Sequence, residues 1–148
     1  MQSENPDPAS QRIEQFRSKG FKITPQRAGI LTLMVDSGRH WSAEDVFQSL
    51  RDEYPMISRT TVYRNLESLV VEGLLARLQH ANRAVLYDAN LDQHHHFFCL
   101  QCGAIADLYL DKIDYEIDPI RTDVLPSMVL RPELQLHGFC EDCAGVEL

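Results

Sequence analysis

Apolar residues recur at helical spacing through the first half of the chain, and they predict four short helices. The first is predicted from about Gln11 to Lys19, immediately before Gly20. The second follows Thr24 as N-cap, with Pro25 as its first helical residue. Both residue types favour a helix start, so this boundary is well defined.

The third and fourth helices also carry start signals. Ser42 can cap the third helix together with Asp45, three residues on, and Pro55 lies beyond its end. The fourth helix opens at Ser58 and stops at Gly73. The residues predicted to face a common core are Ile13, Phe16, Ile30, Leu31, Leu33, Met34, Val46, Phe47, Leu50, Val62, Leu66, Leu69 and Val70.

Two strands are predicted after the fourth helix, at residues 74–79 and 84–88, joined by a polar turn around residues 80–83. Short helices followed by a two-stranded ribbon are typical of a winged helix-turn-helix. Any small helical domain with a terminal hairpin fits the same pattern.

The composition of the fourth helix favours the DNA-binding alternative. Its first two turns place polar and basic side chains around a buried Val62, and a recognition helix reads DNA mostly from such N-terminal turns. Arginine can bind guanine bidentately, threonine can contact a thymine methyl, and hydroxyls can hold phosphates. The alternative interpretation is that these side chains form an ordinary solvent-exposed helix face that binds no ligand. The candidate DNA-binding residues are Arg59, Thr60, Thr61, Tyr63 and Arg64.

The net charge of −8 argues against a nucleic-acid binder only if it is spread evenly along the 148 residues. Residues 1–91 hold 11 basic and 11 acidic residues, whereas residues 92–148 hold 3 and 11. The acidic excess therefore lies in the C-terminal part, and residues 12–83 carry +3.

The chain has no apolar run long enough to span a membrane, and its first ten residues are polar, unlike a signal peptide. We therefore expect a cytoplasmic protein, whose cysteines stay reduced.

All four cysteines fall in two C-x-x-C pairs, Cys99 with Cys102 and Cys140 with Cys143. Two such pairs can close a tetrahedral four-thiolate site, which is typical of structural zinc. A thioredoxin-like redox pair lacks its preceding strand and following helix here, and disulfides are rare in the cytosol. The pattern favours zinc.

A histidine run precedes the first cysteine pair. In a strand, His94 and His96 share one face. A simple hairpin that pairs Cys99 with Ala104 also sets His96 opposite Asp107. Imidazole and carboxylate ligands suit iron, manganese, zinc or nickel, and such a site can exchange its ion. A polar strand edge is the alternative interpretation.

Together these residues resemble the ferric uptake regulator family over about residues 10 to 143. The motifs that carry the resemblance are Thr24-Pro-Gln-Arg27, the Thr-Val-Tyr-Arg-Asn-Leu core of residues 58–66, His94-x-His96-x-x-Cys99-x-x-Cys102-Gly103 and Cys140-x-x-Cys143. The resemblance implies an α+β fold, with an N-terminal winged helix-turn-helix domain and a small C-terminal α/β dimerisation domain. The expected organisation is a flexible tail at 1–10, the DNA-binding domain at 11–88, a hinge at 89–93 and the metal-binding dimerisation domain at 94–148.

By the same resemblance the protein is a metal-dependent repressor, a homodimer that binds a palindromic operator. The implied structural zinc ligands are Cys99, Cys102, Cys140 and Cys143. The implied regulatory ligands are His40, Asp88, His94, His96 and Asp107, which would bind Fe²⁺ or Mn²⁺, with Zn²⁺ as an alternative.

Aspartate rather than glutamate at Asp88 and Asp107 resembles the peroxide-responsive branch of the family. In that branch ferrous iron reacts with peroxide, and a histidine ligand is modified, matched here by His40 or His94. Regulators of the ferric-uptake and zinc-uptake types remain alternatives.

The chain also departs from the family pattern. Pro119, following Asp118 as N-cap, and Pro126 leave room for only a short helix where the family has a longer one. No histidine lies between Phe97 and Leu136, so a further metal site of some relatives is not carried over.

Two other classes of function fit only part of the sequence. A metalloenzyme, such as a hydrolase using the histidine site, needs an open coordination position and a general base, and the chain has no H-E-x-x-H motif. A zinc-ribbon or metal-storage protein leaves the helix after Ser58 without a role. The sequence therefore favours a transcriptional repressor that is not an enzyme.

Overall fold

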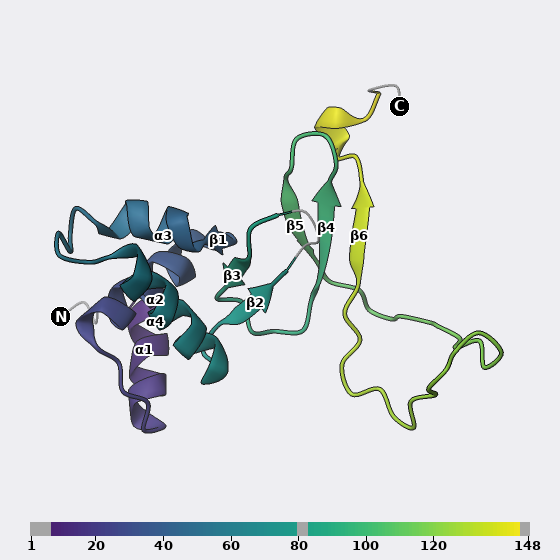
Figure 1. The fold of residues 1–148 in the computed structure, drawn as a ribbon, viewed down its shortest axis with the longest axis horizontal. Coiled ribbons are helices and arrows are strands. Elements are labelled where there is room, and N and C mark those ends of the chain that lie inside the picture. Colours follow the sequence, from purple (N-terminus) through teal and green to yellow (C-terminus); the bar gives the residue numbers. More distant parts are fainter. Residues whose placement is uncertain (1–6, 80–82, 146–148) are drawn as a thin grey trace, which may run out of the picture. The chain divides into compact units, whose positions relative to one another are not determined.

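The computed structural model describes residues 7–79 and 83–145, in two compact units that divide between Leu91 and Asp92. Figure 1 shows helices with a small sheet in the first unit and a sheet with a long loop in the second. The first unit contains α1 (Pro8–Ser18), α2 (Pro25–Ser37), β1 (Trp41–Ser42), α3 (Ala43–Leu50), α4 (Arg59–Val71), β2 (Ala76–Leu78) and β3 (Leu86–Asp88). The second contains β4 (His95–Cys99), β5 (Ile105–Leu108), β6 (Gln135–Gly138) and the 3₁₀ turn η1 (Glu141–Cys143). The α+β fold class is confirmed.

Three helices begin where the sequence predicts. The side chains of Thr24 and Ser58 accept backbone N–H bonds at the starts of α2 and α4, and Ser42 forms a reciprocal capping box with Asp45 at the start of α3. Gly73 ends α4 with a φ of 76°, in the left-handed region that glycine adopts without strain. Local capping chemistry therefore sets these boundaries.

The prediction for α1 was wrong at its start. The helix begins at Pro8, not at Gln11, because Asp7 caps it by accepting a hydrogen bond from the Ser10 backbone at 2.8 Å. Pro8 occupies the first helical position, as Pro25 does in α2. Residues 8–10 thus belong to the helix and not to the expected tail, while residues 1–6 lie outside the described residues.

The ribbon after α4 is present, with shorter strands than predicted. β2 and β3 pair antiparallel, and β3 also pairs with the two-residue strand β1, which the sequence did not predict. The predicted turn at residues 80–83 lies largely outside the described residues, which resume at Arg83. Three short helices, a sheet of order β1-β3-β2 and α4 before the ribbon form a winged helix-turn-helix.

The core of the first unit joins all four helices to the ribbon. Its fully buried side chains are Ile30, Leu31, Met34, Val46, Val62, Leu66, Leu69 and Tyr87. Leu33, Phe47 and Val70, which the sequence also assigned to the core, are only partly buried and pack at its edge. The buried Arg27 ties α2 to α4, because its guanidinium donates to Ser68 at 2.8 Å and to Glu72 at 2.9 Å.

The helices of the first unit are short. α2 and α4 have 13 residues each. Within residues 7–79 and 83–145 no helix is long and apolar enough to cross a membrane.

The second unit is built on a three-stranded sheet of order β5-β4-β6. β4 and β5 are antiparallel, and His96 lies opposite Asp107, which is the predicted register. The backbone N–H of Cys99 donates to Ala104 at 2.9 Å, as the predicted hairpin requires. β6 runs parallel to β4, with Cys99 beside Gly138. Both cysteine pairs therefore meet at one end of this sheet.

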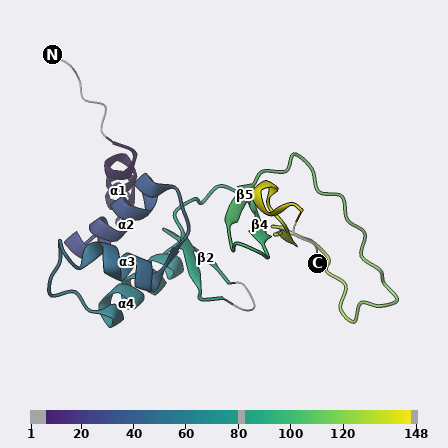
Figure 2. The ribbon, with the colours of Figure 1, turned by 90° about the horizontal axis from the view of Figure 1, so that it is seen from above.

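Residues 109–134 form a wide loop that extends from the sheet (Figures 1 and 2). The predicted short helix after Asp118 was wrong: Asp118 caps only a turn, by accepting a hydrogen bond from the Ile120 backbone at 2.9 Å. A helix this short needs tertiary packing. Here the loop leaves its apolar side chains exposed, among them Ile120, Val124, Met128 and Leu130.

Candidate metal centres

The four cysteine sulfurs form one cluster in the second unit. All Sγ atoms lie within 4.8 Å of one another, and Cys102 Sγ is 3.7 Å from Cys140 Sγ. Zn–S bonds of about 2.3 Å in a tetrahedron place sulfurs about 3.8 Å apart. All four cysteines are free thiols, not disulfides. The sulfurs are thus arranged as a tetrahedral thiolate site requires.

Backbone N–H groups already favour thiolate at this cluster. They hydrogen-bond to the sulfur of Cys99, first from Cys102 and then from Cys140, and lower its pKa to about 6. The contact with Cys140 and the burial of the thiol raise the pKa of Cys143 to about 12. Four thiolates cannot share this space without a cation, so the donor set fits a divalent metal ion.

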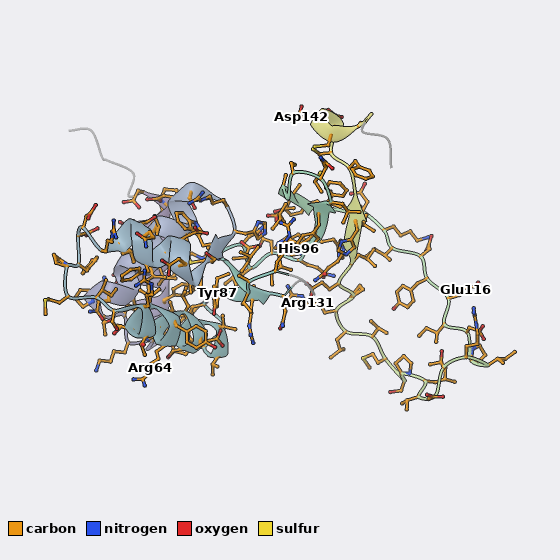
Figure 3. The ribbon with its side chains drawn as sticks, turned by 45° about the horizontal axis from the view of Figure 1, so that its top comes forward. Arg64, Tyr87, His96, Glu116, Arg131 and Asp142 are labelled. Carbon is orange, nitrogen blue, oxygen red and sulfur yellow. The ribbon has the colours of Figure 1, made fainter. Side chains whose placement is uncertain are left out.

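His94, His96 and Asp107 form a second donor set in the same unit. The Nε2 atoms of His94 and His96 lie 3.5 Å and 3.7 Å from Asp107 Oδ1. The two imidazole ring centres are 4.6 Å apart. Both histidines are buried, and they project from the β4 region toward β5 (Figure 3 labels His96). Two imidazoles and one carboxylate can bind one ion from the same face.

The tautomer of His94 is set by its surroundings. Its Nδ1 lies 2.7 Å from the carbonyl oxygen of Asp92. A carbonyl only accepts, so Nδ1 carries the proton and Nε2 keeps the lone pair that a metal needs. This orienting carbonyl was not predicted, because a backbone group leaves no mark in the sequence pattern.

Glu133 is a second neighbour that the sequence did not indicate. Its Oε1 lies 4.0 Å from His96 Nδ1. Glu133 is brought there because β6 runs parallel to β4 and pairs Gln135 with His96. A parallel pairing across a long loop cannot be inferred from strand periodicity.

The first unit holds a separate pair, His40 and Asp88. His40 Nε2 lies 3.3 Å from Asp88 Oδ2, and both side chains are nearly buried. The pairing of Trp41 with Tyr87 in the β1–β3 ladder carries His40 to Asp88. The other oxygen, Asp88 Oδ1, accepts the Asn90 backbone N–H at 2.8 Å and so fixes the carboxylate.

The predicted DNA-binding side chains lie in the first two turns of α4. Arg59, Thr60, Tyr63 and Arg64 are exposed around the buried Val62, and Arg64 projects outward (Figure 3). Thr61 is half-buried, and its backbone N–H donates to the cap residue Ser58 at 3.1 Å. Four of the five candidates can therefore reach a ligand directly from the helix surface.

Comparison with known proteins agrees with these features. The profile of the ferric uptake regulator family matches residues 18–124. The peroxide-responsive repressor PerR of Staphylococcus saprophyticus is 31% identical over 88% of this chain and 88% of its own length. The peroxide operon regulator of Bacillus subtilis is 31% identical over 91% of this chain and 92% of its own. The ferric uptake regulator of Francisella tularensis, solved with iron, is 27% identical with a TM-score of 0.61, over 84% of this chain and 95% of that one.

Proposed function

This chain belongs to the ferric uptake regulator family, and from that premise we propose that it is a dimeric, metal-dependent DNA-binding repressor that senses peroxide. The observation that carries the proposal is the presence of two donor sets of different chemistry in the second unit. The four thiols suit a closed structural site, and the imidazole and carboxylate set suits an exchangeable ion. The relatives at 31% identity are named as regulators, which favours this role over an enzyme.

The structural metal in this proposal is zinc, bound by Cys99, Cys102, Cys140 and Cys143. Zn²⁺ supplies a redox-inert tetrahedral centre. The cysteines join the C-terminal end of β4 to the chain beyond β6, so their common ligand holds the sheet together. The site has no open coordination position, and its role is to stabilise the fold.

The regulatory ion, Fe²⁺ or Mn²⁺, is bound by His94, His96 and Asp107 together with His40 and Asp88. Fe²⁺ and Mn²⁺ prefer about six ligands in octahedral geometry. The second unit offers three donor residues and the first unit offers two, so neither set is sufficient alone, and together they supply five. His40 and Asp88 belong to the first unit and the other three to the second. A shared ion therefore makes the relative position of the two units depend on metal.

The DNA partner is bound by α4 in this proposal. Its first turns carry Arg59, Thr60, Tyr63 and Arg64 on the surface, where arginine and hydroxyl groups can contact base edges and phosphates. The charge distribution is compatible with this role, since the acidic excess lies in residues 92–148.

The homodimer is supported by the exposed apolar side chains of the second unit. Tyr109, Ile120, Val124, Met128 and Leu130 are each more than half exposed in the single chain. Apolar surface of this extent is typical of an interface with another chain. A second copy of the unit would cover it and present two α4 helices to the two halves of a palindromic operator.

Peroxide sensing is supported by the similarity to the two peroxide regulators and by the aspartate ligands Asp88 and Asp107. Bound ferrous iron supplies one-electron reduction of peroxide. The family resemblance matches the histidine that would take up oxygen to His40 or His94, whose Nε2 atoms lie 3.3 Å and 3.5 Å from carboxylate oxygens of the candidate ligands Asp88 and Asp107. An oxidised imidazole loses its donor geometry, so the site loses affinity for its ion.

We expect peroxide to abolish DNA binding by the iron-loaded protein only. Protein loaded anaerobically with Fe²⁺ or with Mn²⁺ is treated with hydrogen peroxide, and its binding to duplexes selected from a random pool is measured by mobility shift. The iron form should lose DNA binding, and its peptide containing His40 or His94 should gain the mass of one oxygen atom. The manganese form should keep its DNA affinity and its peptide masses unchanged. An iron form that is indifferent to peroxide contradicts peroxide sensing, and binding that needs no added metal contradicts the metal-dependent repressor as a whole.

A further inference from the structure

Arg59, the first residue of α4, contacts two side chains of α3, and a third side chain supports one of them. Its Nε and Nη2 donate to the two carboxylate oxygens of Glu44 at 2.8 Å and 3.0 Å. The guanidinium carbon lies 4.4 Å from the ring centre of Phe47. Gln48 donates to Glu44 Oε1 at 2.8 Å and so fixes the carboxylate in turn. One face and one edge of the guanidinium are thus occupied.

This arrangement does little for the stability of the fold. The side chains of Arg59 and Glu44 are 65% and 53% exposed. Ion pairs this exposed contribute little to unfolding free energy, because water and salt screen them. The contact is nevertheless bidentate, and the hydrogen bond from the Arg59 guanidinium lowers the pKa of Glu44 to about 2. Its geometry therefore calls for a role other than packing.

The contact with Glu44 leaves some N–H groups of the Arg59 guanidinium available to another ligand. A guanidinium has five N–H groups, and Glu44 engages two of them. The other three have no acceptor among the described residues, and they include the two of Nη1. These donors form a planar edge, which is the shape that binds guanine O6 and N7 together.

Charge distinguishes a base contact from a phosphate contact. The Glu44–Arg59 pair is neutral as a unit, so its attraction to the DNA backbone is weak. A phosphate contact would gain from removing Glu44, whereas a base contact gains from a guanidinium whose orientation is already fixed. We propose that Glu44 is a positioning residue that orients Arg59 to read one guanine in each half of the operator, an inference that rests on the proposed function.

The test is the selection of duplexes from a random-sequence pool by Mn²⁺-loaded protein. Five proteins are compared: wild type, Glu44→Gln, Arg59→Lys, the double variant that carries both changes, and the control Asp52→Asn. Glu44→Gln keeps the size of the side chain and removes the charge that fixes the guanidinium. Asp52 lies just beyond α3 on the surface and is not one of the residues that contact Arg59 through the interactions described above, so Asp52→Asn makes the same charge change outside that contact.

We expect Glu44→Gln to relax the preference for guanine at one position per half-site by about fivefold to tenfold, the lower part of the range for one bidentate base contact. Its binding to random-sequence DNA should stay equal or strengthen. Arg59→Lys should relax the same position more strongly, because lysine lacks the planar fork. The double variant should relax it no further than Arg59→Lys alone. Asp52→Asn should select the wild-type motif.

Two results would overturn the inference while leaving the proposed function intact. One is a Glu44→Gln motif identical to that of wild type. The other is tighter binding of Glu44→Gln to all sequences with unchanged preference, which would mean that Glu44 only masks a phosphate contact. A wild-type protein that selects no motif would overturn the proposed function and this inference together.

Discussion

Replacing Cys102 with serine should release the metal of the cysteine site and unfold the second unit. In the described part of that unit only Phe98 and Cys99 are apolar and almost fully buried. Three strands of four or five residues cannot support a stable core of their own. Structural zinc contributes roughly 10–16 kcal/mol to the folding of small domains, far more than this sheet supplies.

The measurement combines metal analysis with hydrogen exchange. We expect the Cys102→Ser protein to contain less than the wild-type amount of zinc and to lose exchange protection throughout β4, β5 and β6. The first unit has its own core of helix residues and should keep its protection. Gln101→Ser, at an exposed position in the same turn, is the matched control and should behave as wild type. A zinc-free Cys102→Ser protein with protected β4 amides would contradict a structural role for the metal.

Replacing His96 with alanine should remove the response of DNA binding to metal. His96 is 5% exposed, lies opposite Asp107 and shares its face of the sheet with His94. Loss of a partner that merely orients a ligand typically weakens a metal site about 10–100-fold, so loss of a ligand should weaken it by about 100-fold or more. The cysteine site does not include His96, so zinc content and dimerisation should be unchanged.

The matched control for this variant is His95→Gln. His95 is equally buried on the same strand, but it points to the other face, and its Nδ1 accepts the Leu134 backbone N–H at 3.1 Å. Glutamine retains an acceptor for that bond. We expect DNA affinity, measured by fluorescence anisotropy with and without Mn²⁺, to respond to metal in His95→Gln and not in His96→Ala. A full metal response in His96→Ala would exclude His96 as a ligand.

The sequence predicts those features of this protein that local chemistry determines. Thr24, Ser42 and Ser58 begin their helices because a side-chain oxygen satisfies a backbone N–H three residues on. Asp107 could be predicted because a tight hairpin fixes the register of its two strands.

Features that depend on distant pairing could not be predicted. β1 has only two residues, so no periodicity marks it, and yet its pairing with β3 brings His40 to Asp88. Only the family resemblance identified His40. The Glu44–Arg59 contact joins two exposed helix positions, which a pattern of polar residues does not distinguish. The helix expected after Asp118 is absent, and the apolar side chains of this segment, such as Ile120 and Val124, are exposed and pack against none of the described residues.

In the proposed function, one ion shared by the His40 and Asp88 set and the His94, His96 and Asp107 set controls DNA binding. Linkage requires that DNA then change the affinity for the ion by the same factor as the ion changes the affinity for DNA. The most direct test is therefore the Mn²⁺ dissociation constant of the zinc-loaded protein, measured with and without a saturating selected duplex. We expect DNA to tighten Mn²⁺ binding, so that the factors for the two ions of the dimer multiply to the factor by which full Mn²⁺ loading tightens DNA binding. A Mn²⁺ affinity that is the same with and without DNA would contradict this proposal.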